Sequence, residues 1–332
     1  MKVLCIATKD FGGQMISICQ ALNQHTNHSA CCIVEHLSYQ QYPTDILVSD
    51  YYDVDEDLPQ LIEYVKDADF FIFQQAIPWK LLRLLKLADK VTPTSTLIQI
   101  PLPPKPILAS QLFYRWIRKG YLYFGPMNNC ALFNTIGRAA PIGNILPIDR
   151  MPPINRSGDK IRVLFYPTHN REFNNAWPSI QDTLLARYDN LEFVTAQRMP
   201  WQELMALKAT CHITMSVLGI NTYSNSAIES MYLRHVVIST IDKWTRFCFP
   251  DLPIVDAWTP QSAIEELSYL AETPAAIEEI GEKGRQFVLE HHHPQIIATQ
   301  LSHLMLHTTT KTEQLDIPFN LRDIAFRERD AP

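Results

Sequence analysis

The sequence predicts an α/β protein made of two doubly wound domains of similar size, and three observations support this prediction. Short apolar runs typical of buried parallel strands recur along the chain, as at 3–7 and 161–166. Amphipathic stretches with a helical period alternate with these runs, which is the pattern of a parallel sheet covered by helices. The alternation stops at a proline-containing polar segment, 149–160, and then restarts, so this segment is typical of a linker.

Length and composition agree with this division. The chain has 332 residues, which is too many for one ordinary core, and 46% of them are apolar and 19% charged. We therefore expect an N-terminal domain over 1–150, a C-terminal domain over 151–308 and a polar tail over 309–332. Because doubly wound sheets bind ligands at the carboxyl ends of their strands, we expect the two domains to face each other across a ligand-binding cleft.

The expected elements follow from the apolar periodicity. In the first half we expect strands at 3–7, 31–34, 69–73, 96–100 and 141–147, and helices at 14–22, 57–66, 77–88 and 109–118. In the second half we expect strands at 161–166, 191–195, 211–216 and 236–239, and helices at 178–187, 200–208, 227–233, 261–270, 275–290 and 295–306.

Charge and cysteine usage restrict the partners and the compartment. The formal charge of −6 argues against a nucleic-acid partner bound through a broad basic face, while short basic stretches at 80–90 and 115–119 leave peripheral membrane contact open. The seven cysteines are scattered and form no CxxC pair, which favours reduced thiols. The N-terminus does not resemble a signal peptide, and no apolar run reaches the roughly 18 residues of a membrane span. We therefore expect a cytoplasmic protein.

A small-residue loop that leads into a helix is the most informative motif. Ser224, Asn225 and Ser226 can present backbone N–H groups and hydroxyls at the helix N-terminus, where the helix dipole also favours an anion such as a diphosphate. Glu229 lies one turn further on, where it can accept hydrogen bonds from ribose hydroxyls. The pair Ser226 and Glu229 also has the spacing of a capping box, so simple helix capping stays open as the alternative.

The stretch YSNSAIESMYLRHVVI, residues 223–238, resembles the donor-binding signature of GT-B glycosyltransferases, in particular retaining enzymes of the group 1, family 4-like kind. The positions that match are Tyr223, Ser226, Glu229 and 237–238. The resemblance implies two Rossmann-like domains facing across a cleft. It also implies that Tyr223 and residues 224–226 belong to the phosphate site and that Glu229 binds the ribose.

The chain departs from this signature at four positions. Ser224 replaces the usual glycine, and Arg234 and Val236 stand where glycine and proline are common. Asn221 stands where the family has an acidic residue that helps to hold the sugar. Asn221 can still hydrogen-bond a sugar hydroxyl without carrying a charge, so we keep it as a catalytic candidate.

The loop after the strand at 161–166 is the second motif. In the resembling family this loop supplies a basic residue to the diphosphate, and Arg171 is the candidate here because a guanidinium can bind phosphate bidentately. Thr168, His169 and Asn170 are candidates for contacts with phosphate or acceptor. The alternative is a surface loop with one exposed arginine.

Two further strand-to-helix loops carry candidates. Gly12 and Gly13 follow the first strand, where the resembling family has a glycine-rich loop facing the donor phosphate, although a plain tight turn is the alternative. Asp10, beside them, is the available carboxylate for a general base. Arg198 and Met199 lie in a loop that reads the nucleotide base in the family. Because no clear general base follows the strand at 69–73, the sequence favours a retaining mechanism.

Two patterns invite a metal interpretation, and neither supports it. Residues 291–293 are consecutive histidines, which point in different directions on a helix and so do not converge on one ion. The acidic run at 53–57 lies in a loop, outside the setting that a metal-dependent sugar-nucleotide site needs. We expect neither a metal nor a cofactor.

Together these observations favour a metal-independent, retaining glycosyltransferase that moves a sugar from a nucleotide diphosphate sugar, UDP- or GDP-linked, to a hydroxyl acceptor. A nucleotide-sugar epimerase of the same fold and a non-catalytic binding protein remain the alternatives. The sequence does not select the sugar, the base or the acceptor.

Overall fold

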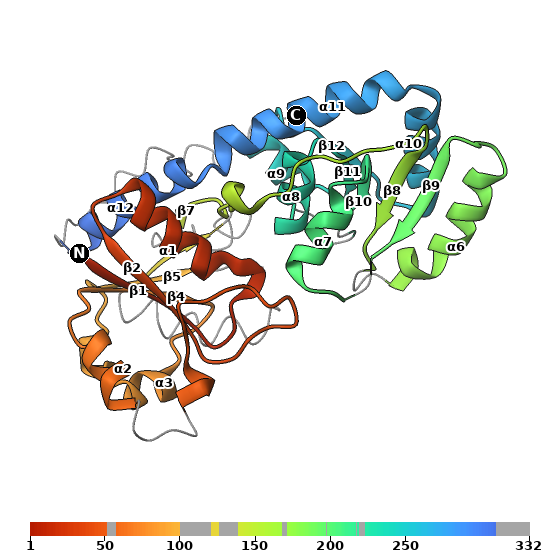
Figure 1. Ribbon diagram of the computed structural model, residues 1–332. Helices are drawn as coiled ribbons and strands as arrows, with labels where there is room; N and C mark the ends of the chain where they lie inside the picture. Colours follow the sequence, from red (N-terminus) through yellow and green to blue (C-terminus); the bar gives the residue numbers. More distant parts are fainter. Residues whose placement is uncertain are drawn as a thin grey trace. The chain divides into compact units, whose positions relative to one another are not determined.

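The computed structural model describes residues 1–51, 58–99, 121–125, 139–167, 171–196, 198–216, 218 and 223–309 (Figure 1). The chain divides into two compact units, which we call the N-unit and the C-unit. The N-unit begins with residues 1–38 and 42–145, and the C-unit consists of 39–41 and 146–293. The chain then returns to the N-unit at Pro294. The helix expected at 295–306 thus lies in the N-unit, whereas the sequence placed it in the C-terminal domain.

The N-unit contains a seven-stranded parallel sheet in the order β3-β2-β1-β4-β5-β6-β7. Its strands are β1 (Lys2–Ala7), β2 (Ser29–Val34), β3 (Ile46–Leu47), β4 (Phe70–Gln74), β5 (Thr96–Gln99), β6 (Leu122–Gly125) and β7 (Ala139–Pro141). Its α-helices are α1 (Gln14–His25), α2 (Leu58–Val65), α3 (Trp79–Leu84) and α12 (Pro294–Thr309).

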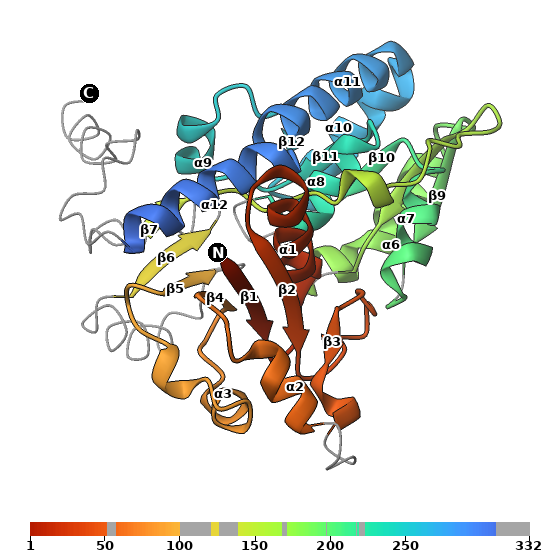
Figure 2. The same cartoon turned by 60° about the vertical axis from the view of Figure 1, so that its left-hand side comes forward.

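Alternate side chains of the central strands fill two separate cores of the N-unit, because successive residues of a strand point to opposite faces. Val3 and Cys5 of β1 pack with α1 and α12, and Leu4 and Ile6 pack with α2 and α3. Figure 2 shows the sheet between these helices. Helix α12 belongs to this unit because buried residues of its apolar face, such as Leu301, join the core beside α1.

The C-unit contains a five-stranded parallel sheet in the order β12-β11-β10-β8-β9. Its strands are β8 (Ile161–Phe165), β9 (Leu191–Thr195), β10 (Ile213–Met215), β11 (Val236–Ser239) and β12 (Ile254–Asp256). Its α-helices are α6 (Arg171–Leu185), α7 (Trp201–Lys208), α8 (Asn225–Tyr232), α9 (Lys243–Cys248), α10 (Pro260–Glu272) and α11 (Pro274–His291).

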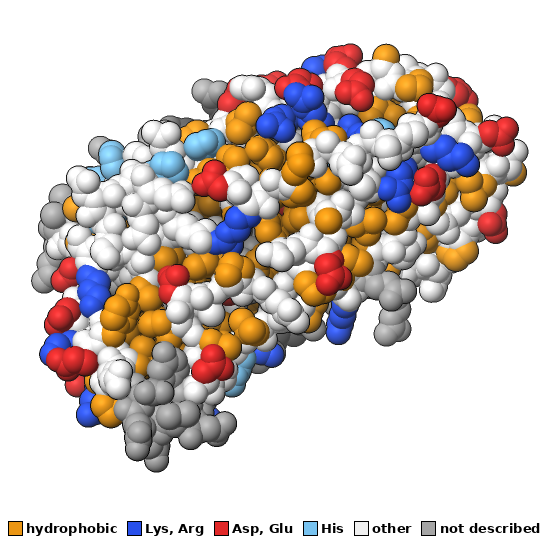
Figure 3. Space-filling view, in the orientation of Figure 1, with side chains coloured by type: hydrophobic (Ala, Val, Ile, Leu, Met, Phe, Trp, Pro, Cys, Tyr) orange, Lys and Arg blue, Asp and Glu red, His pale blue; other side chains and the backbone are white. Residues whose placement is uncertain are grey.

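The C-unit also buries both faces of its sheet. Side chains of α6 and α10 pack with β8 and β10, and side chains of α8 and the end of α11 pack with β11 and β12. On the outer side of α11, acidic and basic side chains are interspersed (Figure 3), and Lys283 pairs with Glu279 at 2.6 Å. In the described part of the chain, no helix is long and apolar enough to cross a membrane.

The largest local difference from expectation is the start of α6. The sequence predicted a polar loop up to residue 175, but the helix begins at Arg171 and contains Pro178. Phe173 and Trp177 are spaced four residues apart and both are buried, and the ring of Trp177 stacks on Phe165 of β8 at 4.2 Å. This packing extends the helix through polar residues whose local sequence alone is typical of a loop.

The last strand of the N-unit also differs. The apolar run at 141–147 forms only the end of β7, which stops at Pro141. Ile142 and Ile145 are buried in the core from irregular backbone. These apolar residues are therefore buried, as their character predicted, but the run beyond Pro141 does not form a strand. The predicted loop at 101–106, the helix expected at 109–118 and the tail beyond residue 309 lie outside the described residues.

Gly12 and Gly13 form the tight turn between β1 and α1. Both have left-handed backbone, with φ of +69° and +62°. A Cβ on Gly13 would lie 2.4 Å from Cδ1 of the buried Tyr42 ring. Gly13 is therefore required both by its backbone conformation and by the space around it.

We expect Gly13→Ala to lower the free energy of unfolding by more than Gly158→Ala does. Gly158 has φ of +91° with nothing within 4 Å of an added Cβ, so alanine there meets only the left-handed penalty of about 1–2 kcal/mol. At Gly13 the clash with Tyr42 adds about 1–3 kcal/mol. Urea denaturation of the two variants measures the difference, and equal losses would contradict the packing argument.

Candidate functional site

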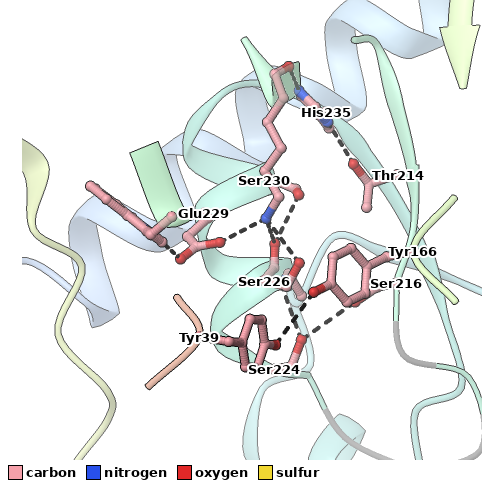
Figure 4. Close-up of polar contacts among 12 residues, drawn as sticks. Tyr39, Tyr166, Thr214, Ser216, Ser224, Ser226, Glu229, Ser230 and His235 are labelled. Carbon is pink, nitrogen blue, oxygen red and sulfur yellow. Dashed lines mark hydrogen bonds and ion pairs between the residues drawn. The ribbon is translucent and has the colours of Figure 1, made fainter. Parts of the chain in front are cut away.

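The C-unit sheet has its topological switch between β8 and β10. The chain moves from β8 to β9 on one side and then returns to β10 on the other, and ligands of such sheets bind at the carboxyl ends of the strands flanking this point. Tyr166 follows β8, and Ser216 follows β10. Ser216 Oγ lies 3.5 Å from Ser224 Oγ, in the segment that leads into α8 (Figure 4).

Helix α8 begins at this edge of the sheet. Ser224 is its N-cap, with extended backbone and a side-chain oxygen that accepts a hydrogen bond from the amide of Ala227 at 3.3 Å. Residues 223–226 are partly exposed, whereas 227–230 are buried. Ser226 thus lies inside the first turn, and Glu229 turns toward α7. The capping box that the sequence left open between Ser226 and Glu229 is not formed.

The side chain of Glu229 is held from two sides by α7. Its Oε2 accepts a hydrogen bond from Nζ of Lys208 at 2.7 Å, and its Oε1 accepts one from Nε1 of Trp201 at 2.8 Å. Nζ of Lys208 also donates to the carbonyl oxygen and to Oγ of Ser226, both at 2.8 Å. The sequence analysis chose Glu229 and Ser226 and missed Lys208 and Trp201, which fix their positions.

Lys208 is completely buried, which is unusual for an ammonium group. Burial lowers the pKa of Lys208, and the adjacent carboxylate of Glu229 opposes this change. A buried charge is tolerated only when it is paired and hydrogen-bonded. The first turn of α8 and the end of α7 are therefore joined by a polar contact that the surrounding core makes costly to break.

His235, in the turn before β11, anchors the backbone of the same lysine. Its Nε2 lies 2.8 Å from the carbonyl oxygen of Lys208, and its Nδ1 lies 2.7 Å from Oγ1 of Thr214. Because a carbonyl only accepts, Nε2 carries the hydrogen, and the neutral ring then accepts from Thr214. Complete burial lowers the pKa of His235 far below 6.5, so the ring is neutral at physiological pH.

Three side chains gather beside the end of β8. The hydroxyls of Tyr39 and Tyr166 lie 3.5 Å apart, and the guanidinium of Arg198 lies 5.6 Å from the centre of the Tyr39 ring. Loss of water around Tyr166, its contact with Tyr39 and the nearby charge of Glu229 raise the pKa of Tyr166. Arg198 is exposed, and Met199 beside it is partly exposed, in the loop between β9 and α7.

Tyr223 is placed differently from the polar residues that follow it. Its ring makes edge contacts with Phe249, Phe287 and His292, with centres 5.6–6.1 Å apart. Burial raises the pKa of its hydroxyl. His291 packs on Phe287 at 4.5 Å. The rings of both histidines thus join this aromatic cluster, and among the described residues no group of three or more His, Cys, Asp and Glu side chains could hold a metal ion.

In the N-unit, Asp10 lies at the equivalent switch, between β1 and β4. Its two carboxylate oxygens accept hydrogen bonds from the amides of Met15 and Ile16 at 3.0 and 3.1 Å, which caps the start of α1. Burial raises the pKa of Asp10 to about 6, and these amide hydrogen bonds oppose the rise. Gln74, the last residue of β4, donates to the carbonyl of Phe11 and closes the turn.

Other predicted residues cannot be placed. Thr168, His169, Asn170 and Asn221 lie outside the described residues. Arg171 is the first residue of α6, and its side chain is not described. The roles predicted for these residues and for Asp10 stay predictions.

Comparison with solved structures identifies the fold. A glycosyltransferase from Rickettsia africae superposes with a TM-score of 0.63 at 11% identity, covering 94% of this chain and 99% of that one. HepE from Anabaena, solved with UDP and glucose, gives 0.61 at 10% identity, covering 92% and 99%. A putative UDP-N-acetylglucosamine 2-epimerase from Listeria monocytogenes gives 0.59 at 10% identity, covering 96% and 98%.

The chain has the GT-B fold. Two Rossmann-like domains in one chain, matched over nearly the full length of several GT-B proteins, establish this, as the sequence predicted. No family model matches the chain, and no curated protein matches it. At 10–11% identity the GT-B likeness shows the fold alone.

One further signal for the contact between Lys208 and Glu229 was present in the sequence. Lys208 stands at the end of a helical stretch, WQELMALK, where its predecessors Leu204 and Met205 are buried. Positions 201, 204, 205 and 208 share one helix face, so Lys208 falls on the apolar stripe. A lysine on such a stripe needs a buried partner, and Glu229 is the acid that supplies it.

We expect acid to destabilise the wild-type protein more than the variant His235→Gln. The unfolded chain protonates its histidine near pH 6.5, whereas the folded chain keeps His235 neutral, so the unfolded state binds more protons and stability falls as the pH drops below 6.5. Below pH 6.5, His235 lowers the free energy of unfolding by up to about 1.4 kcal/mol for each pH unit.

Glutamine keeps one donor and one acceptor for the neighbours of His235 but does not titrate. Denaturation of both proteins from pH 7.5 to 5 measures the difference, and the opposite contribution of Asp10, whose pKa is raised, is common to both. Parallel pH profiles would show that His235 is not the group responsible.

Proposed function

We propose that this GT-B protein binds a nucleoside diphosphate sugar at the start of α8 and transfers the sugar to a hydroxyl acceptor. The observation that supports this proposal best is the placement of a partly exposed helix N-terminus, rich in serine, beside the switch between β8 and β10. Several GT-B proteins of like fold were solved with UDP or a UDP-sugar, which supports the same ligand class here.

The first turn of α8 supplies the groups that a diphosphate needs. The backbone N–H groups at its start and the positive end of the helix dipole favour an anion, and the hydroxyls of Ser224 and Ser226 add donors. Glu229, one turn further on, supplies carboxylate oxygens, which accept hydrogen bonds from the two hydroxyls of a ribose. A nucleotide laid along this turn would place phosphate and ribose on complementary groups.

The proposed chemistry is electrostatic and uses no metal. Negative charge develops on the diphosphate as the sugar leaves, and the α8 N-terminus and Arg171 stabilise it. Asn221 holds a sugar hydroxyl. In a retaining reaction the departing diphosphate accepts the acceptor proton, and Asp10, which caps α1, stays the candidate base for an inverting reaction.

A second candidate is epimerisation of the same nucleotide sugar. It is favoured by one finding, namely that proteins named UDP-N-acetylglucosamine 2-epimerase occur among those of like fold, with TM-scores of 0.52–0.59. Both reactions begin with the same bound donor. Incubation of the protein with UDP-N-acetylglucosamine alone separates them, because only an epimerase produces a new sugar without an acceptor.

We expect the wild-type protein to bind UDP or GDP. Ser226→Ala and Glu229→Gln should each weaken that binding about tenfold, because each removes roughly one charge-assisted hydrogen bond. Isothermal titration calorimetry with UDP, GDP and their sugars measures the affinities. Glu279→Gln, on the exposed face of α11, is the matched control and should bind as the wild type does. Absence of binding by the wild type to all of these probes would refute the proposed function.

A further inference from the structure

We propose that Lys208 is a positioning residue of the nucleotide site. It acts through Ser226 and Glu229, directing the hydroxyl of Ser226 toward phosphate and neutralising Glu229 beside it. This inference rests on the proposed function, because it assigns Lys208 a role in that site. It differs from a purely structural role, in which the Lys208–Glu229 pair would only join α7 to α8.

The ammonium group of Lys208 has its full set of partners inside the protein. It carries three hydrogens and has three acceptors at 2.7–2.8 Å: the carbonyl oxygen of Ser226, Oγ of Ser226 and Oε2 of Glu229. All three belong to the first turns of α8 (Figure 4). Lys208 therefore has no hydrogen left for a ligand, and any effect that it has on a ligand passes through Ser226 and Glu229.

The contact with Lys208 sets the direction of the Ser226 hydroxyl. Because Nζ can only donate, Oγ of Ser226 must accept, and its own hydrogen points away from the ammonium group. In the described part of the chain no acceptor for this hydrogen is present, and the residue is partly exposed. The hydroxyl is thus prepared to donate to an anionic oxygen at the α8 N-terminus.

The same ammonium group balances the charge of Glu229. That carboxylate lies three residues after Ser226 and so within one helical turn of the proposed phosphate position. An unpaired carboxylate there would repel a diphosphate, and the helix N-terminus would be partly neutralised by it. With Lys208 at 2.7 Å, Glu229 keeps acceptor sites for ribose while its net charge is offset.

The test is a double-mutant cycle between Lys208→Met and Ser226→Ala in a Glu229→Gln background. The background is needed because removal of Lys208 alone would leave a buried carboxylate without its counter-ion, which costs several kcal/mol. Affinities for UDP and for uridine are measured by calorimetry; GDP and guanosine replace them if the wild type prefers guanine. Circular dichroism confirms that each variant is folded.

In the Glu229→Gln background we expect Lys208→Met to weaken UDP binding about tenfold and to change uridine binding less than twofold. Once Ser226 is alanine, Lys208→Met should have a clearly smaller effect on UDP, because the hydroxyl through which it acts is gone and only the attraction of the ammonium charge remains to be lost. Lys283→Met, which removes an exposed lysine of α11, is the matched control and should change neither affinity.

Two outcomes would overturn the inference while leaving the proposed function intact. One is an equal loss for UDP and uridine, and the other is an equal effect of Lys208→Met with and without Ser226. If the wild type binds neither nucleotide, the proposed function fails and the inference fails with it. If the methionine variant does not fold, Lys208→Gln fills the same space with a polar group and carries the same expectations, with a smaller loss.

Discussion

The contact between the ammonium group of Lys208 and the carboxylate of Glu229, 2.7 Å long and buried, is the interaction on which the rest of the C-unit site depends. Removing two charges from water costs more than their attraction returns unless every remaining donor and acceptor is satisfied. Here the ammonium group also donates to Ser226, and the carboxylate also accepts from Trp201. The backbone carbonyl of Lys208 accepts from His235. A polar network of this kind fixes α7, α8 and the turn before β11 in one arrangement.

One turn of the C-unit has left-handed backbone at a residue other than glycine. Arg234 follows α8 at a position where the resembling GT-B glycosyltransferases commonly have glycine, and its φ is +58°, in the left-handed region that favours glycine. Its carbonyl accepts from the guanidinium of Arg156 at 2.8 Å. Gly281 of α11 leaves the space for this carbonyl, because a Cβ there would lie 2.3 Å from it. Gly281 is therefore required by the close approach of the Arg234 carbonyl to α11.

Much of the fold could be predicted from local patterns, and the reasons for the failures are physical. Short, mainly apolar runs flanked by polar residues predicted strands such as β9 and β11 with their observed bounds. The start of α6 was missed because its helix is stabilised by the stacking of Trp177 on Phe165, a contact between residues of different elements. The placement of α12 was missed because its apolar face fits the core beside α1, which no local pattern reveals.

The candidate site was predictable where chemistry is local and unpredictable where it depends on packing. The serines at the start of α8 and Glu229 were recognisable by spacing and by resemblance. Lys208 lies on an apolar helix stripe that the sequence shows, but its partners and those of His235 are 18 residues or more away along the chain, so no local pattern reveals them.

A crystal structure with a bound nucleoside diphosphate would test the central claim most directly. The account predicts phosphate oxygens within hydrogen-bond distance of the N–H groups and hydroxyls at 224–226, with the ribose on Glu229 and the Lys208 contact retained. A nucleotide bound elsewhere, with the first turn of α8 empty, would contradict it.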